Sequence, residues 1–204
     1  IGLFQSKISK VGLMSKDRLS DIEKQTLLQL ARQSITLAVN KKPLPELDLS
    51  SYTPRLQEDG ASFVTLTENG ELRGCIGTLE PYQPLVQDVC EHAVAAALED
   101  YRFPPVQPWE VPLLRIEVSV LTLPEPLPYE TPDELLSRLR KGVDGVILRD
   151  GVRRATFLPQ VWEKVPDAAE FLSHLCVKMG ARADLWKHKP LQVFTYQVEE
   201  FHED

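Results

Sequence analysis

The chain has 204 residues, of which 43% are hydrophobic, so it can bury a sizeable core in one domain or in one domain with a smaller lobe. Its formal net charge of −7 disfavours nucleic acid as a partner, because such binding relies on clustered lysine and arginine. The sequence has no apolar run near the roughly 18 residues of a membrane span, and the first residues do not follow the pattern of a secretory signal peptide. We therefore expect no membrane segment and no secretory leader.

The three cysteines, Cys75, Cys90 and Cys176, are an odd number and have no short paired spacing. This pattern is typical of reduced thiols and argues against a disulfide framework or a zinc ribbon. We therefore expect a cytoplasmic protein. Cys90 and Cys176 lie on apolar faces of predicted helices, which places both in the core.

The first helix is predicted after an N-terminal segment without clear hydrophobic periodicity. We interpret residues 1–16 as a linker or docking arm and residues 17–204 as a single domain. Ser20 and Glu23 form the capping-box pattern ahead of apolar residues at helical spacing, which predicts a helix that ends near Asn40.

A β-hairpin follows, with its turn at Asn69-Gly70, the dipeptide most typical of a type I′ turn. With this turn, a regular ladder places Leu66 opposite Arg73. It places Val64 opposite Cys75, so Arg73 and Cys75 are expected to project from the same face of the sheet.

The second strand of this hairpin, residues 72–77 (LRGCIG), carries a candidate site. A thiolate is a nucleophile and a nearby guanidinium favours it, which makes Cys75 a candidate nucleophile and Arg73 its activating neighbour. The alternative is that Cys75 is a small buried hydrophobe, as free cysteines usually are. Gly74 and Gly77 favour a site, because glycine within a strand usually marks a bulge or a close approach to the backbone.

Helices and strands alternate over the rest of the chain. The patterns predict helices at 85–100, 131–141 and 167–179, a strand at 114–122, a hairpin at 146–157, and a last strand at 191–198 that leads into an acidic tail. Because tight hairpins imply antiparallel pairing, we predict an α+β fold.

Three histidine and charge patterns add weaker candidates. Asp88 and His92 are four residues apart on a helix and could share a metal ion or a hydrogen bond, although surface or capping roles are favoured in the absence of a metal motif. His174 borders a buried stripe, so an interior histidine is the simpler interpretation and a base for Cys75 is the alternative. The cluster at Asp100, Arg102 and Phe103, just before two prolines, is either a rigid corner or the wall of a cleft.

Several blocks of the chain resemble the AMMECR-one domain family over roughly residues 20–202. The most specific block is LRGCIG at 72–77, and the others are RFPPV at 102–106, IEVSVL at 116–121, DGV at 144–146, FLPQV at 157–161 and FLSHLCVK at 171–178. The resemblance implies an α+β fold in which helices flank an antiparallel sheet and a smaller lobe lies beside it. It also implies a functional surface at a cleft between the lobes, formed by Leu72, Arg73, Gly74, Cys75, Ile76 and Gly77.

In microbes this family is similar to protein A of the AmmeMemoRadiSam system, which implies a Memo-like protein and a radical SAM protein as partners. Neither the residues nor the resemblance identifies a reaction, a cofactor or a metal. Two hypotheses follow. In the first, a small molecule or peptide binds in the cleft, with Cys75 as thiolate, Arg73 as anion contact and His174 as base, and with further contacts from Leu72, Gly74, Ile76, Gly77, Arg102 and Phe103. In the second, the chain is a non-catalytic docking module whose glycines admit a partner's backbone.

Overall fold

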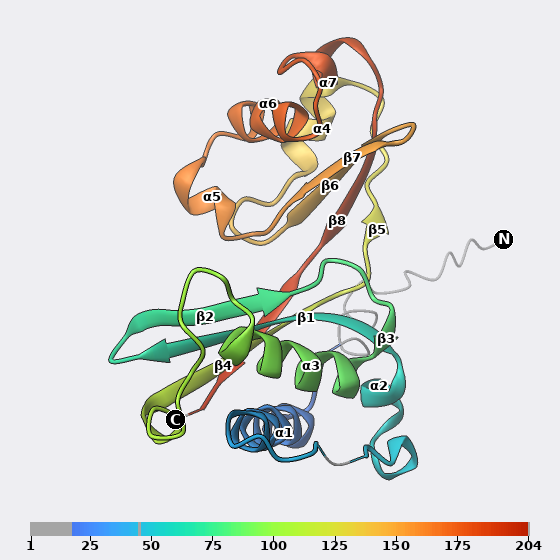
Figure 1. Cartoon of the computed structure of the whole chain (residues 1–204). Helices are drawn as coiled ribbons and strands as arrows, with labels where there is room; N and C mark the ends of the chain where they lie inside the picture. Colours follow the sequence, from blue (N-terminus) through green and yellow to red (C-terminus); the bar gives the residue numbers. More distant parts are fainter. Residues whose placement is uncertain (1–17, 45, 204) are drawn as a thin grey trace, which may run out of the picture. The chain divides into compact units, whose positions relative to one another are not determined.

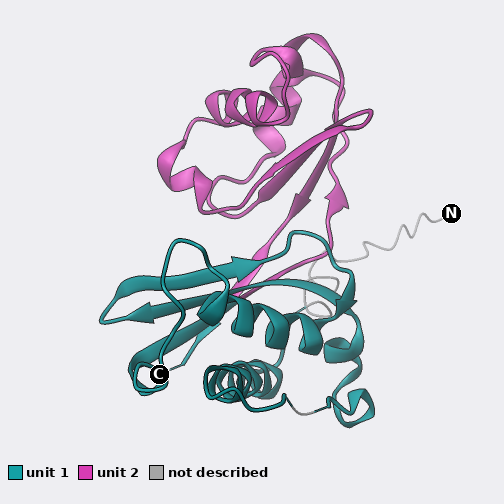
Figure 2. Cartoon of the chain, viewed as in Figure 1, with its two compact units in different colours: residues 1–118, 201–204 teal, residues 119–200 magenta. Residues whose placement is uncertain are grey.

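The computed structural model describes residues 18–44 and 46–203, and its secondary structure confirms the predicted α+β class. The chain divides into two compact units (Figure 2). Of the described residues, those up to residue 118 and residues 201–203 form unit 1, and residues 119–200 form unit 2. The predicted arm at residues 1–16 lies outside the described residues.

Unit 1 contains two long helices on one side of a sheet. Helix α1 spans Asp21–Val39 and packs on α3, Leu85–Leu98, which in turn packs on the sheet (Figure 1). The predicted capping box is confirmed, because Ser20 Oγ accepts from the Glu23 amide and the Glu23 carboxylate accepts from the Ser20 amide at 2.7 Å. Three short helical turns complete the unit: η1 at Leu49–Ser51, α2 at Pro54–Gln57 and η2 at Val111–Leu113.

The first sheet has β2 as one of its edge strands. Its order is β2 (Glu71–Gly77), β1 (Asp59–Glu68), β4 (Leu114–Leu121) and β9 (Val198–His202), and β3 (Gln83–Pro84) pairs with the start of β1. The predicted acidic tail at residues 199–204 is wrong for residues 199–202, which belong to β9. The physical reason is Glu203, whose carboxylate binds the Arg32 guanidinium of α1 and so fixes the end of the chain to unit 1.

The hairpin of β1 and β2 has the predicted turn and a different register. Asn69 and Gly70 have φ angles of +54° and +84°, as a type I′ turn requires. A β-bulge then makes Arg73 an extra residue, so that Leu66 lies opposite Gly74. Every pair beyond the bulge is therefore displaced by one residue from the prediction.

This register places Cys75 opposite Thr65, on the face that also carries Phe63 and Gly77. Gly74 lies on the other face, which packs against α3. The predicted register is therefore wrong, because the bulge interrupts the alternation of side chains at Arg73. The argument that Arg73 and Cys75 share a face depended on this register and is wrong as well.

Gly74 and Gly77 are explained by packing within unit 1. A Cβ atom on Gly74 would lie 2.1 Å from the carbonyl oxygen of Ala96 in α3, which is far inside van der Waals contact. A Cβ atom on Gly77 would lie 2.3 Å from the Ser62 carbonyl oxygen and 2.4 Å from the Phe63 ring. Both positions therefore need glycine even when no partner is bound.

Unit 2 packs helices on a second sheet. The sheet order is β5 (Glu125–Pro126), β8 (Gln192–Tyr196), β6 (Gly145–Asp150) and β7 (Arg153–Phe157), and the helices are α4 (Pro132–Arg138), α5 (Val161–Lys164), α6 (Ala168–Lys178) and α7 (Leu185–His188). In its core, the Trp162 ring stacks on the Phe171 ring with centroids 3.7 Å apart. Among the helices of residues 18–44 and 46–203, none combines the length and hydrophobicity needed to cross a membrane.

The close approach at Gly74 leads to a prediction about stability. Gly74→Ala should lower the free energy of unfolding by about 3 kcal/mol, because the added methyl group collides with helix backbone that cannot move aside cheaply. Gly70→Ala is the matched control on the same hairpin: its φ is positive but no atom lies within 4 Å, so about 1 kcal/mol is expected. Urea denaturation of both variants measures the difference, and equal losses would contradict this account of Gly74.

Candidate functional site

Two side chains from the loop after α3 hold the backbone of Cys75 at the free edge of β2. The Cys75 amide donates to Asp100 Oδ2 at 2.8 Å, and the Cys75 carbonyl oxygen accepts from Arg102 Nη2 at 3.2 Å. The two side chains also bind each other, with Arg102 Nε 2.9 Å from Asp100 Oδ1 and Nη2 2.6 Å from Oδ2. We call this pair, Asp100 and Arg102, the edge clasp.

The edge clasp gives the peptide groups of Cys75 the partners that a further strand would otherwise supply. The Asp100 carboxylate is buried, and the Arg102 guanidinium that binds it holds the pKa of Asp100 well below its ordinary value. The same contact raises the pKa of Arg102. Both groups therefore stay charged at neutral pH, and the bonds that they make to Cys75 are charge-assisted.

The thiol of Cys75 differs from the other two thiols in its surroundings. Cys75 is half-buried, and the Thr65 hydroxyl donates to its Sγ atom at 3.3 Å. Cys90 and Cys176 are buried in the cores of their units, as predicted, and burial raises the pKa of both thiols. Cys75 is thus the most accessible of the three cysteines.

Arg73 is bound to a partner that the sequence did not indicate. Its Nε atom lies 2.9 Å from Glu110 Oε1 and its Nη2 atom lies 3.2 Å from Oε2, and the two side chains are only 13% and 9% exposed. The guanidinium lowers the pKa of Glu110, which also accepts from the Gln107 amide at 2.6 Å. This pair therefore ties the loop at residues 107–113 to β2.

The other predicted site residues around Cys75 differ in their environments. The Phe103 ring lies against the clasp, with its centroid 5.5 Å from Arg102 Cζ. Leu72 is 43% exposed. Ile76 is half-buried and lines a cavity of about 500 Å³ along α1 and α3, together with Cys90 and others. The structure thus gathers Arg102 and Phe103 at Cys75, whereas Ile76 faces a separate cavity.

His174 belongs to α6 in unit 2, whereas Cys75 belongs to unit 1. Its side chain is 55% exposed, with Nε2 3.8 Å from the Glu170 carboxylate. The interpretation of His174 as an interior histidine is therefore wrong. Its role as a base for Cys75 stays a prediction.

The predicted surface role of Asp88 and His92 is also wrong, because both side chains are buried. Their alternative, a hydrogen bond, is confirmed: His92 Nδ1 lies 3.1 Å from Asp88 Oδ2, which also accepts from the Ser62 hydroxyl at 2.6 Å. The described part of the chain contains no group of three or more side chains placed to hold a metal ion. The pair therefore serves as a buried polar contact between α3 and β1.

Two site residues, Thr65 and Glu110, were missed by sequence reasoning, and the contacts of Asp100 were not foreseen. The position of Thr65 opposite Cys75 could have been predicted from the hairpin pattern if that pattern had included the bulge at Arg73. Glu110 has no local signal, since it lies 37 residues from its partner.

Comparisons with known proteins agree with the resemblance noted from the motifs. The AMMECR1 family model matches residues 28–201. A protein of Methanothermobacter thermautotrophicus is 42% identical over 188 residues, covering 91% of this chain and 97% of that protein, and one of Thermofilum pendens is 40% identical over 195 residues, covering 90% and 91%. The crystal structure of the uncharacterized protein PH0010 from Pyrococcus horikoshii matches with a TM-score of 0.72 and 36% identity, covering 91% of this chain and 94% of that one. The chain therefore belongs to the AMMECR1 family.

Proposed function

We propose that this protein binds a small-molecule or peptide ligand at the face of β2 that carries Cys75, with the Cys75 thiolate as the reacting group. The observation that carries the proposal is the edge clasp. It fixes the backbone on both sides of the Cys75 side chain by charge-assisted hydrogen bonds, while the thiol remains half-buried and accepts from Thr65. A reactive group on a rigid strand is held in place more precisely than one on a loop.

The anion contact of this proposal is Arg102. Its side chain is 43% exposed, and its Nε and Nη2 atoms bind Asp100 and Cys75. Its Nη1 atom donates to no residue in the described part of the chain, so it can donate to a ligand carboxylate or phosphate. Arg73 was the predicted anion contact, but Glu110 engages its guanidinium, and we assign it a positioning role instead.

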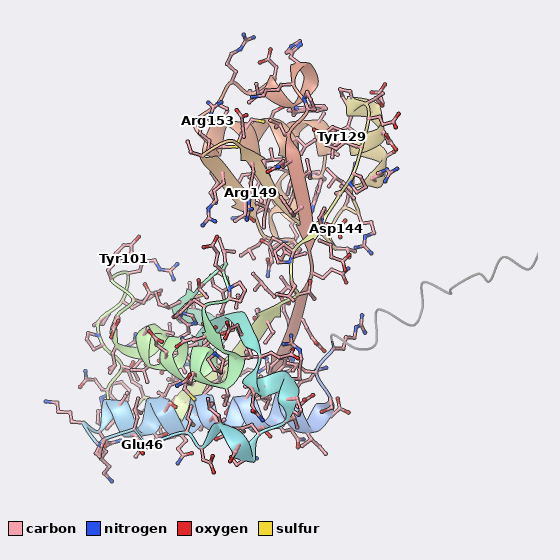
Figure 3. All side chains as sticks on the ribbon, turned by 90° about the vertical axis from the view of Figure 1, so that its right-hand side faces the viewer. Glu46, Tyr101, Tyr129, Asp144, Arg149 and Arg153 are labelled. Atoms are coloured by element: carbon pink, nitrogen blue, oxygen red, sulfur yellow. The ribbon has the colours of Figure 1, made fainter. Side chains whose placement is uncertain are left out.

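A second candidate function is a non-catalytic module that docks a Memo-like protein and a radical SAM protein. Exposed aromatic side chains favour it: Tyr101 is 94% exposed at the tip of the loop after α3 (Figure 3), and Trp109 is 68% exposed beside Glu110. The two functions differ in their need for the thiol. Cys75→Ser should abolish thiol chemistry and leave docking nearly unchanged.

Alkylation by iodoacetamide tests the thiol directly. In the folded protein at pH 8, Cys75 should react on the order of ten times faster than Cys90 and Cys176, because burial raises the pKa of the latter two and lowers their thiolate fraction. Peptide mass mapping of one sample reports all three rates, so the two buried cysteines act as internal controls. Equal rates at the three positions would remove Cys75 as the reacting group.

The positioning role of Arg73 predicts a pH-dependent loss of stability in Glu110→Gln. At pH 7 the variant should lose about 3 kcal/mol of unfolding free energy, because it leaves a guanidinium that is only 13% exposed without its counter-charge. The pKa of Glu110 is lower in the folded than in the unfolded state, so the pair stabilises the protein above the ordinary value of 4.5 and ceases to do so as the pH falls. The difference from the unsubstituted protein should therefore shrink from pH 7 to pH 3 in urea denaturation.

Glu134→Gln is the matched control for this experiment, because Glu134 pairs with Arg138 in an exposed i,i+4 contact and its loss should change stability little. A pH-independent loss in Glu110→Gln, or a loss no larger than in Glu134→Gln, would argue against the positioning role.

A further inference from the structure

Besides the N–H and C=O groups of Cys75, which the edge clasp binds, the outer edge of β2 has a second N–H and C=O pair that points away from the sheet. In an antiparallel ladder, alternate residues direct their N–H and C=O groups to opposite neighbours. The Thr78 amide donates to the Ser62 carbonyl oxygen of β1 at 3.0 Å, whereas the Cys75 amide and carbonyl bind the clasp outside the sheet. Gly77 lies two residues from Cys75 in regular register, so its N–H and C=O groups also point away from β1. Outside the strand ladder, neither group has a hydrogen bond to a described residue.

The order of groups along this edge follows from the direction of β2. Within a residue the N–H group precedes the C=O group, so Asp100, bound to the Cys75 amide, lies on the side of Gly74. Arg102, bound to the Cys75 carbonyl, lies on the side of Gly77. The guanidinium thus stands between the Asp100 carboxylate and the open peptide groups of Gly77.

We propose that the ligand of this site is the C-terminus of a peptide, which adds to β2 as an antiparallel strand. The peptide backbone pairs with the N–H and C=O groups of Gly77, and its terminal carboxylate accepts from Arg102 Nη1. The inference rests on the proposed function and names the ligand class of the same site.

Three observations determine this class. The outward groups of Gly77 match the hydrogen-bonding pattern of an extended backbone. The clasp already occupies the groups of Cys75, about 7 Å further along the edge, so an added strand has to end there. A chain that ends at a guanidinium is best matched by a carboxylate, and one that approaches from beyond Gly77 with its C-terminus at Arg102 runs antiparallel to β2.

Amide hydrogen exchange at Gly77, measured by NMR, tests the inference on the unsubstituted protein. The probe is a mixture of N-acetylated pentapeptides, randomised at every position and added at millimolar concentration as free acids. The same mixture with C-terminal amides is the control. The free acids should slow exchange at Gly77 on the order of tenfold, because its amide gains an acceptor, and the amides should not.

A pair of variants tests the role of the guanidinium. Arg102→Gln should weaken binding of the free acids about tenfold, as expected for the loss of a charge-assisted hydrogen bond. Arg138→Gln removes an exposed arginine of unit 2 and should leave binding unchanged.

Unchanged exchange at Gly77 with the free acids would overturn the inference, and equal slowing by acids and amides would overturn its carboxylate part. These failures are distinguishable from failure of the proposed function. If Cys75 is still alkylated faster than Cys90 and Cys176, the thiol site stands and only the peptide ligand is wrong.

Discussion

The candidate site depends on the hydrogen bonds between the peptide groups of Cys75 and the edge clasp. An edge strand leaves these groups without a partner from the sheet, and here a carboxylate and a guanidinium take that place. Each charged group is compensated by the other and by the backbone, which offsets the cost of burying Asp100. The clasp therefore holds one strand residue in a fixed position without closing the rest of the edge.

The position of the clasp follows from the close contact between α3 and β2. Gly74 lets the backbone of β2 approach the carbonyl group of Ala96 near the end of α3, an approach that any side chain would prevent. Asp100 is four residues beyond Ala96, so the chain leaves the helix beside Cys75. The Arg73–Glu110 ion pair then fastens the following loop to the same strand. A glycine, a helix end and two ion pairs thus act together to build the site.

The local elements of this fold could be predicted from the sequence because their causes lie within a few residues. The capping box at Ser20, the turn at Asn69-Gly70 and helix α6, which Asp167 caps and Gly180 follows, all have such causes. The register beyond Arg73 could not be predicted, because the bulge there accompanies a tertiary contact. Gly74, the next residue, packs against α3, which is distant in the sequence. The last strand, β9, was missed for the same kind of reason: Glu203 is held by a side chain 171 residues away. For the candidate site, the sequence placed Cys75, Arg102 and Phe103 in one hypothesis, and these residues lie together in the structure. It could not assign Glu110 to Arg73.

The most direct test of the edge clasp is the amide hydrogen exchange rate of Cys75 in the ligand-free protein, compared with that of Gly77 on the same edge. The clasp predicts slow exchange at Cys75, whose amide donates to Asp100, and fast exchange at Gly77, whose amide has no acceptor among the described residues. Asp100→Ala should then raise the rate at Cys75 toward the rate at Gly77. Equal rates at the two amides in the unsubstituted protein, or an unchanged rate at Cys75 in Asp100→Ala, would contradict this account.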